Sequence, residues 1–235
     1  MDTTAGPSLP PDIAETLGQV ARTLESEQTV EGTLKAVVAA AMENIPGADH
    51  AGISLLEKGT IRTMAPSGEI VNRIDKLQYQ LGEGPCVNSI TDHRTYRTGD
   101  LAAESRWPRF GEETATMGVL SMLSFRLFTA EDTLGALNLY SAERDAFDVN
   151  AQQIGELFAV HAAIALAGSQ QESHLLAALD SRDLIGMAKG ILMERHRVNE
   201  DRAFAIMVDA SQKSQLKLHE VARWLVDEAA AAAKK

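Results

Sequence analysis

Residues 184–193, LIGMAKGILM, open the part of this sequence that decides its fold. Their apolar side chains recur three or four positions apart, which indicates a helix with one buried face. Two more such runs follow, and Asn199 is a good N-cap for the first of them. The expected buried faces hold Leu184, Ile185, Ala188, Ile191 and Leu192, then Ala203, Phe204, Ile206, Met207 and Ala210, then Leu218, Val221, Ala222, Leu225 and Val226.

Basic and short hydrogen-bonding side chains surround these three runs. Cations at a helix–turn–helix corner can hold phosphates, while polar neighbours reach base edges. For any single cation a solvated surface is the alternative interpretation, so the candidate is the group. The candidate nucleic-acid-binding residues are Arg182, Lys189, Arg195, Arg197, Ser211, Gln212, Lys213, Ser214, Gln215, Lys217 and Arg223.

Residues 175–230 resemble the ANTAR domain, a three-helix RNA-binding module of bacterial transcription antiterminators. The resemblance lies in residues 188–193, Ala203-Phe204, Ser211, Lys217-Leu218 and Val221-Ala222. It implies that Ala188, Ala203 and Ala222 are core, and that the module binds paired stem-loops in nascent mRNA and so prevents terminator formation. Two positions depart from the family pattern: Gln215 stands where Asn is common, and His219 where Arg is common.

Composition places limits on the rest of the chain. Its 235 residues suit one or two domains, with 45% hydrophobic and 23% charged residues. No apolar run reaches the ~18 residues of a membrane span, and the N-terminus lacks the features of a signal peptide. We therefore expect a cytoplasmic protein without membrane contact. The single cysteine, Cys86, excludes an intramolecular disulfide and a cysteine-built zinc site.

The net charge of −11 is unevenly distributed. Residues 1–168 carry 12 Lys and Arg against 23 Asp and Glu, whereas residues 169–235 carry 10 of each. A neutral module binds nucleic acid only if its cations share one face. This balance favours a selective reader over a protein that coats nucleic acid.

The first 168 residues mix helical and strand patterns. Residues 1–10 are expected to be a disordered leader, and a helix is expected to start at Pro11. A second helix, capped by Thr29, ends at Ile45-Pro46-Gly47. Two hairpins follow, at 50–65 and 120–141, and residues 78–118 between them are expected to form a long irregular segment.

A long helical pattern begins after Phe147, with Asp148 as its N-cap, and continues to His196. Residues 148–181 of it are expected to connect two domains as a coiled-coil-like dimer helix lined by Phe158, Ile164, Leu175 and Leu179. The alternative is two helices with a kink near Gly168-Ser169.

Residues 11–168 resemble a GAF domain, a small-molecule-sensing fold with a central antiparallel sheet. The matching residues are 81–86 (LGEGPC), Asp100-Leu101, Arg106-Trp107-Pro108, Gly118-Val119, Ser121, 134–141 (LGALNLYS) and Phe147, a pattern similar to GAF domains joined to ANTAR domains in actinobacteria. The expected fold is an α+β GAF-like domain, its antiparallel sheet flanked by helices, joined by a long helix to an all-α three-helix ANTAR domain.

No catalytic constellation is expected in the GAF-like part. Cys86, Asp92 and His93 carry no implied geometry, and GAF domains that reduce methionine sulfoxide need more than one cysteine. Cys86 is interpreted as a small buried hydrophobe or as a thiol sensor, and His161 as a packed residue rather than a haem ligand. Trp107 and Phe110 are interpreted as core or lid residues. No metal or cofactor is required, and the small-molecule ligand of the GAF domain stays unidentified.

Together, the two resemblances imply a homodimeric, non-enzymatic, signal-responsive antiterminator that binds paired RNA stem-loops. The alternative is a DNA-binding regulator with a GAF sensor, because three short helices also form helix-turn-helix domains. Its reading helix would carry only Lys217, His219, Glu220 and Arg223, and Glu220 would repel phosphate. Trp224 lies one position off the apolar stripe and either packs on the first helix of the tail or presents its ring to an RNA base.

Overall fold

A computed structural model describes residues 18, 22, 27, 29–130 and 132–232. The chain divides into two compact units, residues 1–170 and 171–235. The expected leader and most of the helix expected from Pro11 lie outside the described residues. Within the part of the chain that is described, no helix is long and apolar enough to cross a membrane.

The first unit is built on a five-stranded antiparallel sheet in the order β2-β1-β5-β4-β3. Its strands are β1 (His50–Glu57), β2 (Thr60–Thr63), β3 (Tyr96–Thr98), β4 (Ser121–Phe128) and β5 (Thr133–Ser141). Both predicted hairpins are confirmed: β1 pairs with β2, and β4 with β5. The two hairpins then join side by side, because β1 also pairs with β5.

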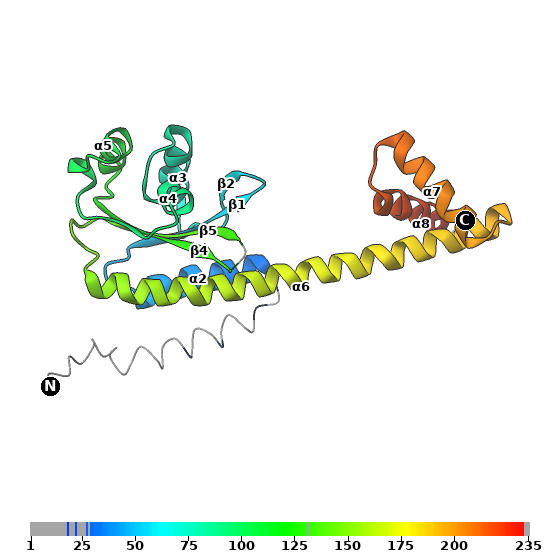
Figure 1. The fold of residues 1–235 in the computed structure, drawn as a ribbon, viewed down its shortest axis with the longest axis horizontal. Coiled ribbons are helices and arrows are strands. Elements are labelled where there is room, and N and C mark those ends of the chain that lie inside the picture. Colours follow the sequence, from blue (N-terminus) through cyan, green and yellow to red (C-terminus); the bar gives the residue numbers. More distant parts are fainter. Residues whose placement is uncertain (1–17, 19–21, 23–26, 28, 131, 233–235) are drawn as a thin grey trace. The chain divides into compact units, whose positions relative to one another are not determined.

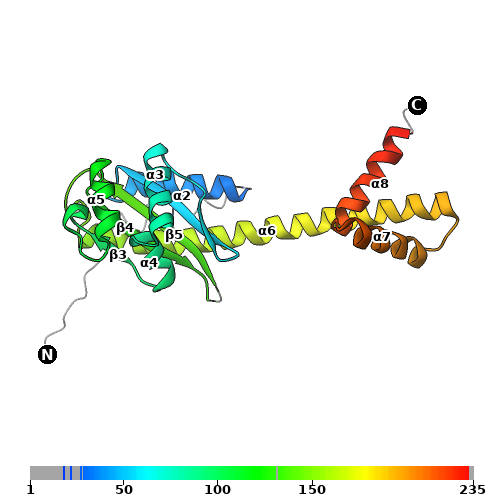
Figure 2. The ribbon, with the colours of Figure 1, turned by 90° about the horizontal axis from the view of Figure 1, so that it is seen from above.

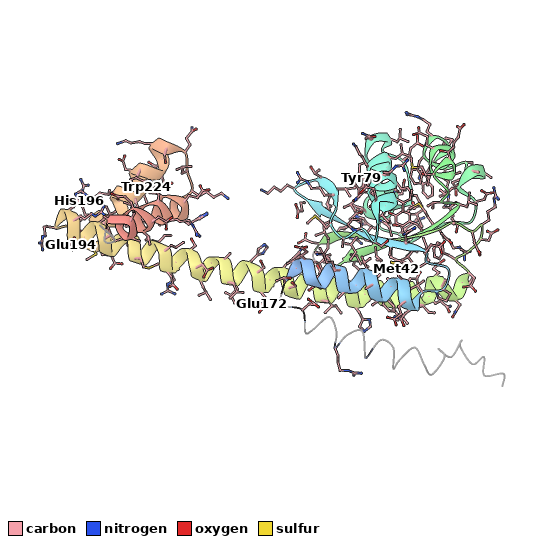
Figure 3. All side chains as sticks on the ribbon, turned by 180° about the vertical axis from the view of Figure 1, so that it is seen from behind. Met42, Tyr79, Glu172, Glu194, His196 and Trp224 are labelled. Atoms are coloured by element: carbon pink, nitrogen blue, oxygen red, sulfur yellow. The ribbon has the colours of Figure 1, made fainter. Side chains whose placement is uncertain are left out.

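Helices cover both faces of this sheet (Figure 1). α2 (Val30–Asn44) and the first part of α6 (Val149–His196) pack on one face, around a core that includes Leu34, Phe125 and Phe158. α3 (Glu69–Leu81), α4 (Pro85–Thr91) and α5 (Pro108–Thr116) lie over the other face (Figures 1 and 2). Figure 3 shows Met42 on α2 and Tyr79 on α3, on opposite sides of the sheet.

The cap predicted for α2 is confirmed, because the Gly32 N–H donates to Thr29 Oγ1 over 3.0 Å. The prediction of an irregular segment over 78–118 is wrong. It holds the end of α3, all of α4, β3 and α5, and a short 3-10 helix, η1 (Leu101–Ala103). Pro85 and Pro108 each open a helix here, because proline fits the first turn, where its missing N–H leaves no bond unmade.

α6 is one continuous helix of 48 residues, so the alternative of a kink near Gly168 is wrong. Asp148 caps it as predicted, since its Oδ1 accepts the Ala151 N–H over 2.7 Å. The expected dimer seam needs correction at Phe158, which is buried in the core of its own unit. Ile164, Leu175 and Leu179 are exposed, and every residue from 171 to 180 is exposed.

The second unit contains the last part of α6 with α7 (Glu200–Ser214) and α8 (Leu218–Ala232) packed on it (Figure 2). Its core is formed by Ala188, Leu192, Ala203, Met207, Val221, Ala222 and Leu225. The three small residues expected at the helix contacts, Ala188, Ala203 and Ala222, are fully buried, which confirms their assignment to the core. Phe204 was expected in this core and is 42% exposed, because Ala203 and Met207 occupy the buried face of α7.

Candidate nucleic-acid interface

The corner between α7 and α8 is held by side chains that the sequence suggested as RNA contacts. Ser211 Oγ donates to the Leu216 carbonyl over 2.6 Å, and Ser214 Oγ donates to the Ala210 carbonyl over 2.7 Å. Gln215 ends α7 in the left-handed conformation, at φ 57°. Asn tolerates this conformation better than most residues, which explains in physical terms why an Asn suits this position.

Glu220 fixes the start of α8, because its Oε2 accepts the Lys217 backbone N–H over 2.7 Å. This bond satisfies a donor that a helix N-terminus would otherwise leave unpaired. Asn199 does the same for α7 by accepting the Arg202 N–H over 3.0 Å, as its N-cap role predicts. Lys213 and Lys217 therefore lie at a corner whose backbone is held in place by hydrogen bonds.

Three of the candidate cations are already paired with carboxylates of the same unit. Lys189 on α6 pairs with Glu200 at the start of α7, and Arg195 on α6 pairs with Glu228 on α8 at 2.8 Å. Lys213 pairs with Asp209, one turn earlier on α7, at 2.7 Å. Surface pairs of this kind contribute about 0–1 kcal/mol, so a phosphate can displace them.

The remaining candidate cations, Arg182, Arg197, Lys217 and Arg223, are exposed and form no ion pair with another described residue. Arg202, on the first turn of α7, shares these properties and was missed from the sequence. It directly follows two acidic residues, Glu200 and Asp201, and is the one cation of that turn, which was the available signal. Gln212 and Gln215 are also exposed.

Trp224 is 63% exposed. Of its two interpretations, packing on the first helix of the tail is therefore wrong. It projects from α8, while Glu194 and His196 mark the C-terminal end of α6 (Figure 3). The core of the unit is complete without it.

The GAF-like unit holds a buried carboxylate, Asp75 on α3, with four hydrogen-bonding partners. Thr63 Oγ1 donates over 2.7 Å, Gln78 Nε2 over 3.2 Å and Ser54 Oγ over 3.4 Å, and the Tyr140 hydroxyl donates as well. No basic side chain among the described residues pairs with it. Burial raises the pKa of Asp75 to about 6, against the opposing effect of these four donors.

We expect this carboxylate to make the stability of the unit depend on pH. A pKa raised from 3.8 to about 6 means that the folded unit holds a proton that the unfolded chain has released. The contribution of the protonated Asp75 to the free energy of unfolding is therefore greatest below pH 3.8, falls as the pH rises to about 6, and is lost above it. The free energy of unfolding should fall by about 3 kcal/mol over this range.

Urea unfolding between pH 4 and pH 7.5 measures this, with Trp107 as the reporter in a Trp224→Phe background. Asp75→Asn should remove the fall in the free energy of unfolding, whereas the exposed control Glu112→Gln should keep it. The same fall in the Asp75→Asn variant would contradict the assignment.

Cys86 lies in the same buried region, and its backbone N–H donates to Gln78 Oε1 over 2.9 Å. Burial raises the pKa of its thiol to about 12, which leaves almost no thiolate at neutral pH. The interpretation as a small buried residue is confirmed. His93 is exposed while Cys86 is fully buried, so the two side chains do not form a catalytic pair.

The other residues singled out from the sequence have structural positions. Trp107 and Phe110 are core residues, and Trp107 Nε1 donates to Asn88 Oδ1 over 2.8 Å. His161 is half-buried, with Nδ1 2.8 Å from the Leu157 carbonyl oxygen. Within the described ranges, no group of three or more His, Cys, Asp or Glu residues could hold a metal ion.

The chain thus consists of an antiparallel α+β unit followed by a helical unit with exposed cations. The GAF domain model matches residues 27–167, more than half of the sequence, and the chain therefore belongs to the GAF family. The ANTAR domain model matches residues 173–226. A GAF domain joined to an ANTAR domain is a regulatory pairing.

Solved structures support the GAF fold. The GAF domain from a phosphoenolpyruvate-protein phosphotransferase of Coxiella burnetii has 20% identity and a TM-score of 0.54, covering 69% of this chain and 96% of that one. The free methionine-R-sulfoxide reductase from Neisseria meningitidis in complex with its substrate has 17% identity and a TM-score of 0.55, covering 72% of this chain and 99% of that one. A comparison with curated proteins found no match.

Proposed function

We propose that this protein is a signal-responsive transcription antiterminator that binds paired stem-loops in nascent mRNA and prevents the formation of a terminator hairpin. The observation that carries the proposal is the ANTAR match over residues 173–226, on a three-helix unit with exposed cations around its surface. Binding alone suffices for this function, so no catalytic residue, metal or cofactor takes part.

The candidate contacts are the exposed Arg182, Arg197, Lys217 and Arg223, with Lys189, Arg195 and Lys213 after release from their carboxylates. Gln212 and Gln215 supply amides for base edges. Ser211 and Ser214 contribute through the backbone bonds that hold the corner, because their hydroxyls already donate to carbonyls.

We further propose a homodimer, formed along α6. Leu175, Leu176 and Leu179 are 59%, 53% and 48% exposed in a single chain, and a second helix would cover them. Two RNA-binding units in one dimer would raise the affinity for paired stem-loops through their effective concentration. A cytoplasmic location, an actinobacterial origin and control by an unidentified small-molecule ligand of the GAF domain complete the proposal.

A gel shift with the full chain tests the function. The probes are a synthetic RNA with two stem-loops, selected from a pool with randomised loops, and a DNA duplex of equal length. We expect the RNA to bind at concentrations at which the duplex does not. Preference for the duplex would instead support the DNA-binding regulator.

Lys217→Ala and Arg223→Ala should each weaken binding to that RNA and lower the slope of log affinity against log salt by about 0.7, the single-strand value for one phosphate contact. Lys76→Ala on α3, an exposed lysine of the GAF domain, is the control and should change neither. Titrations from 50 to 200 mM salt measure both quantities. A wild-type slope in both tail variants would exclude these two residues from the interface.

A further inference from the structure

Trp224 is the most exposed large apolar side chain of the described ANTAR unit, at 63%. The packed core of the unit uses Val221, Ala222 and Leu225 of the same helix and leaves Trp224 outside. Burying an aromatic ring stabilises a fold through the area that it removes from water, and this ring is left mostly in water. Its presence therefore calls for a partner outside the chain.

The charges near Trp224 favour a nucleic-acid partner. Lys217 immediately precedes α8 and Arg223 is the residue before Trp224; both are exposed and form no ion pair with another described residue. Glu228 lies one turn after it and brings Arg195 to this side of α8 through their 2.8 Å ion pair. Three cations thus lie on or beside the segment of α8 that carries the indole.

Two of the three acidic side chains of α8 are engaged: Glu220, one turn before Trp224, accepts the Lys217 backbone N–H, and Glu228, one turn after it, accepts from Arg195. The third, Asp227, is exposed and forms no ion pair with another described residue. A carboxylate bound to a donor repels phosphate less than a free one, because its charge is partly compensated. Among the described residues of α8, Asp227 is thus the one uncompensated carboxylate near the indole, against the three cations Arg195, Lys217 and Arg223.

We infer that Trp224 is a stacking site for an unpaired RNA base, with Arg195 and Arg223 near the phosphates of that nucleotide. This rests on the proposed function and assigns the ligand class at one position of its site. An indole face accepts any base, whereas base pairs inside a stem are already stacked on each other. Trp224 would therefore read the unpaired loop and not the stem.

The chain contains two tryptophans, which makes the inference directly measurable. Trp107 is 3% exposed in the GAF domain, so Trp107→Phe leaves Trp224 as the reporter. In this full-length background we expect the selected two-stem-loop RNA to quench the emission of Trp224 and to protect it from acrylamide. A fully base-paired RNA duplex should do neither.

Trp224→Ala should weaken binding of the selected RNA on the order of 5- to 150-fold, the range for loss of one stacked base. The salt slope should stay at the wild-type value, because no phosphate contact is lost. Trp224→Phe should recover most of the affinity. Leu216→Ala, at a 49% exposed apolar residue in the turn before α8, is the matched control and should bind as wild type.

The outcomes separate this inference from the function on which it rests. RNA binding with unchanged Trp224 emission and wild-type affinity in Trp224→Ala overturns the stacking site alone. A change of oligomeric state in Trp224→Ala, measured by light scattering, also overturns it, because the ring would then belong to a protein contact. Failure of the wild-type chain to bind any selected RNA overturns both.

Discussion

Ala222→Asp should unfold the ANTAR unit and abolish RNA binding. Ala222 is fully buried on α8 among Ala188, Leu192, Ala203 and Met207, where no side chain can pair with a carboxylate. An unpaired charge in such a core costs several kcal/mol, which is comparable to the whole stability of a small domain. The loss should appear as reduced helicity and as a missing thermal transition in circular dichroism.

The matched control is Ala205→Asp, an exposed alanine on α7. It introduces the same charge on the surface and should leave melting nearly unchanged. Trp107 emission should show that the GAF domain stays folded in both variants. Normal melting of the Ala222→Asp variant would mean that α8 is turned away from the core described here.

Gly135→Ala should cause the largest loss in the GAF domain. Gly135 lies in β5, between β1 and β4, and a Cβ there would come within 1.9 Å of the Ser54 carbonyl oxygen and 2.9 Å of Leu55 Cα. Both neighbours are backbone atoms of β1, so the pairing of two central strands would have to open. We expect a loss of ~4 kcal/mol or more in urea unfolding followed by Trp107 emission in a Trp224→Phe background.

Gly168→Ala provides the opposite result from the same chemical change. A Cβ at this position in α6 meets nothing within 4 Å. Alanine should stabilise the helix there by about 0.5–1 kcal/mol, because glycine loses more backbone freedom on folding. Equal effects of the two substitutions would contradict the close contact assigned to Gly135.

The sequence predicted those elements that are marked by strong local signals, such as a turn, a helix cap or regular helical spacing. The β4–β5 hairpin, the Thr29 and Asn199 caps and the three buried alanines of the tail all follow from turn chemistry or helical spacing. α4 and α5 were not predicted because they are short and because Pro85 and Pro108 suggested a loop, although proline also starts helices. α3 had an available signal, since Val71, Ile74 and Leu77 follow helical spacing.

The sequence predicted which residues belong to the candidate site, but not which side chains they pair with. The sequence indicates which cations the tail contains, yet the Lys189–Glu200 and Arg195–Glu228 pairs join different helices and depend on tertiary packing. Asp75 was missed because a carboxylate on a buried face contradicts the usual pattern, although Asp75 and Gln78 share the face of Val71 and Ile74. Trp224 was ambiguous because one position on a helix, about 100°, separates core from solvent.

Ten consecutive exposed residues, 171–180, leave the middle of α6 with little besides its backbone hydrogen bonds. An isolated helix of this length is marginal in water, and three exposed leucines add nothing to it without a partner. If α6 forms the proposed dimer, helix formation in this stretch and association become a single coupled equilibrium. Dilution would then melt the middle of α6, and the affinity for paired stem-loops would follow protein concentration through the folding of ten residues.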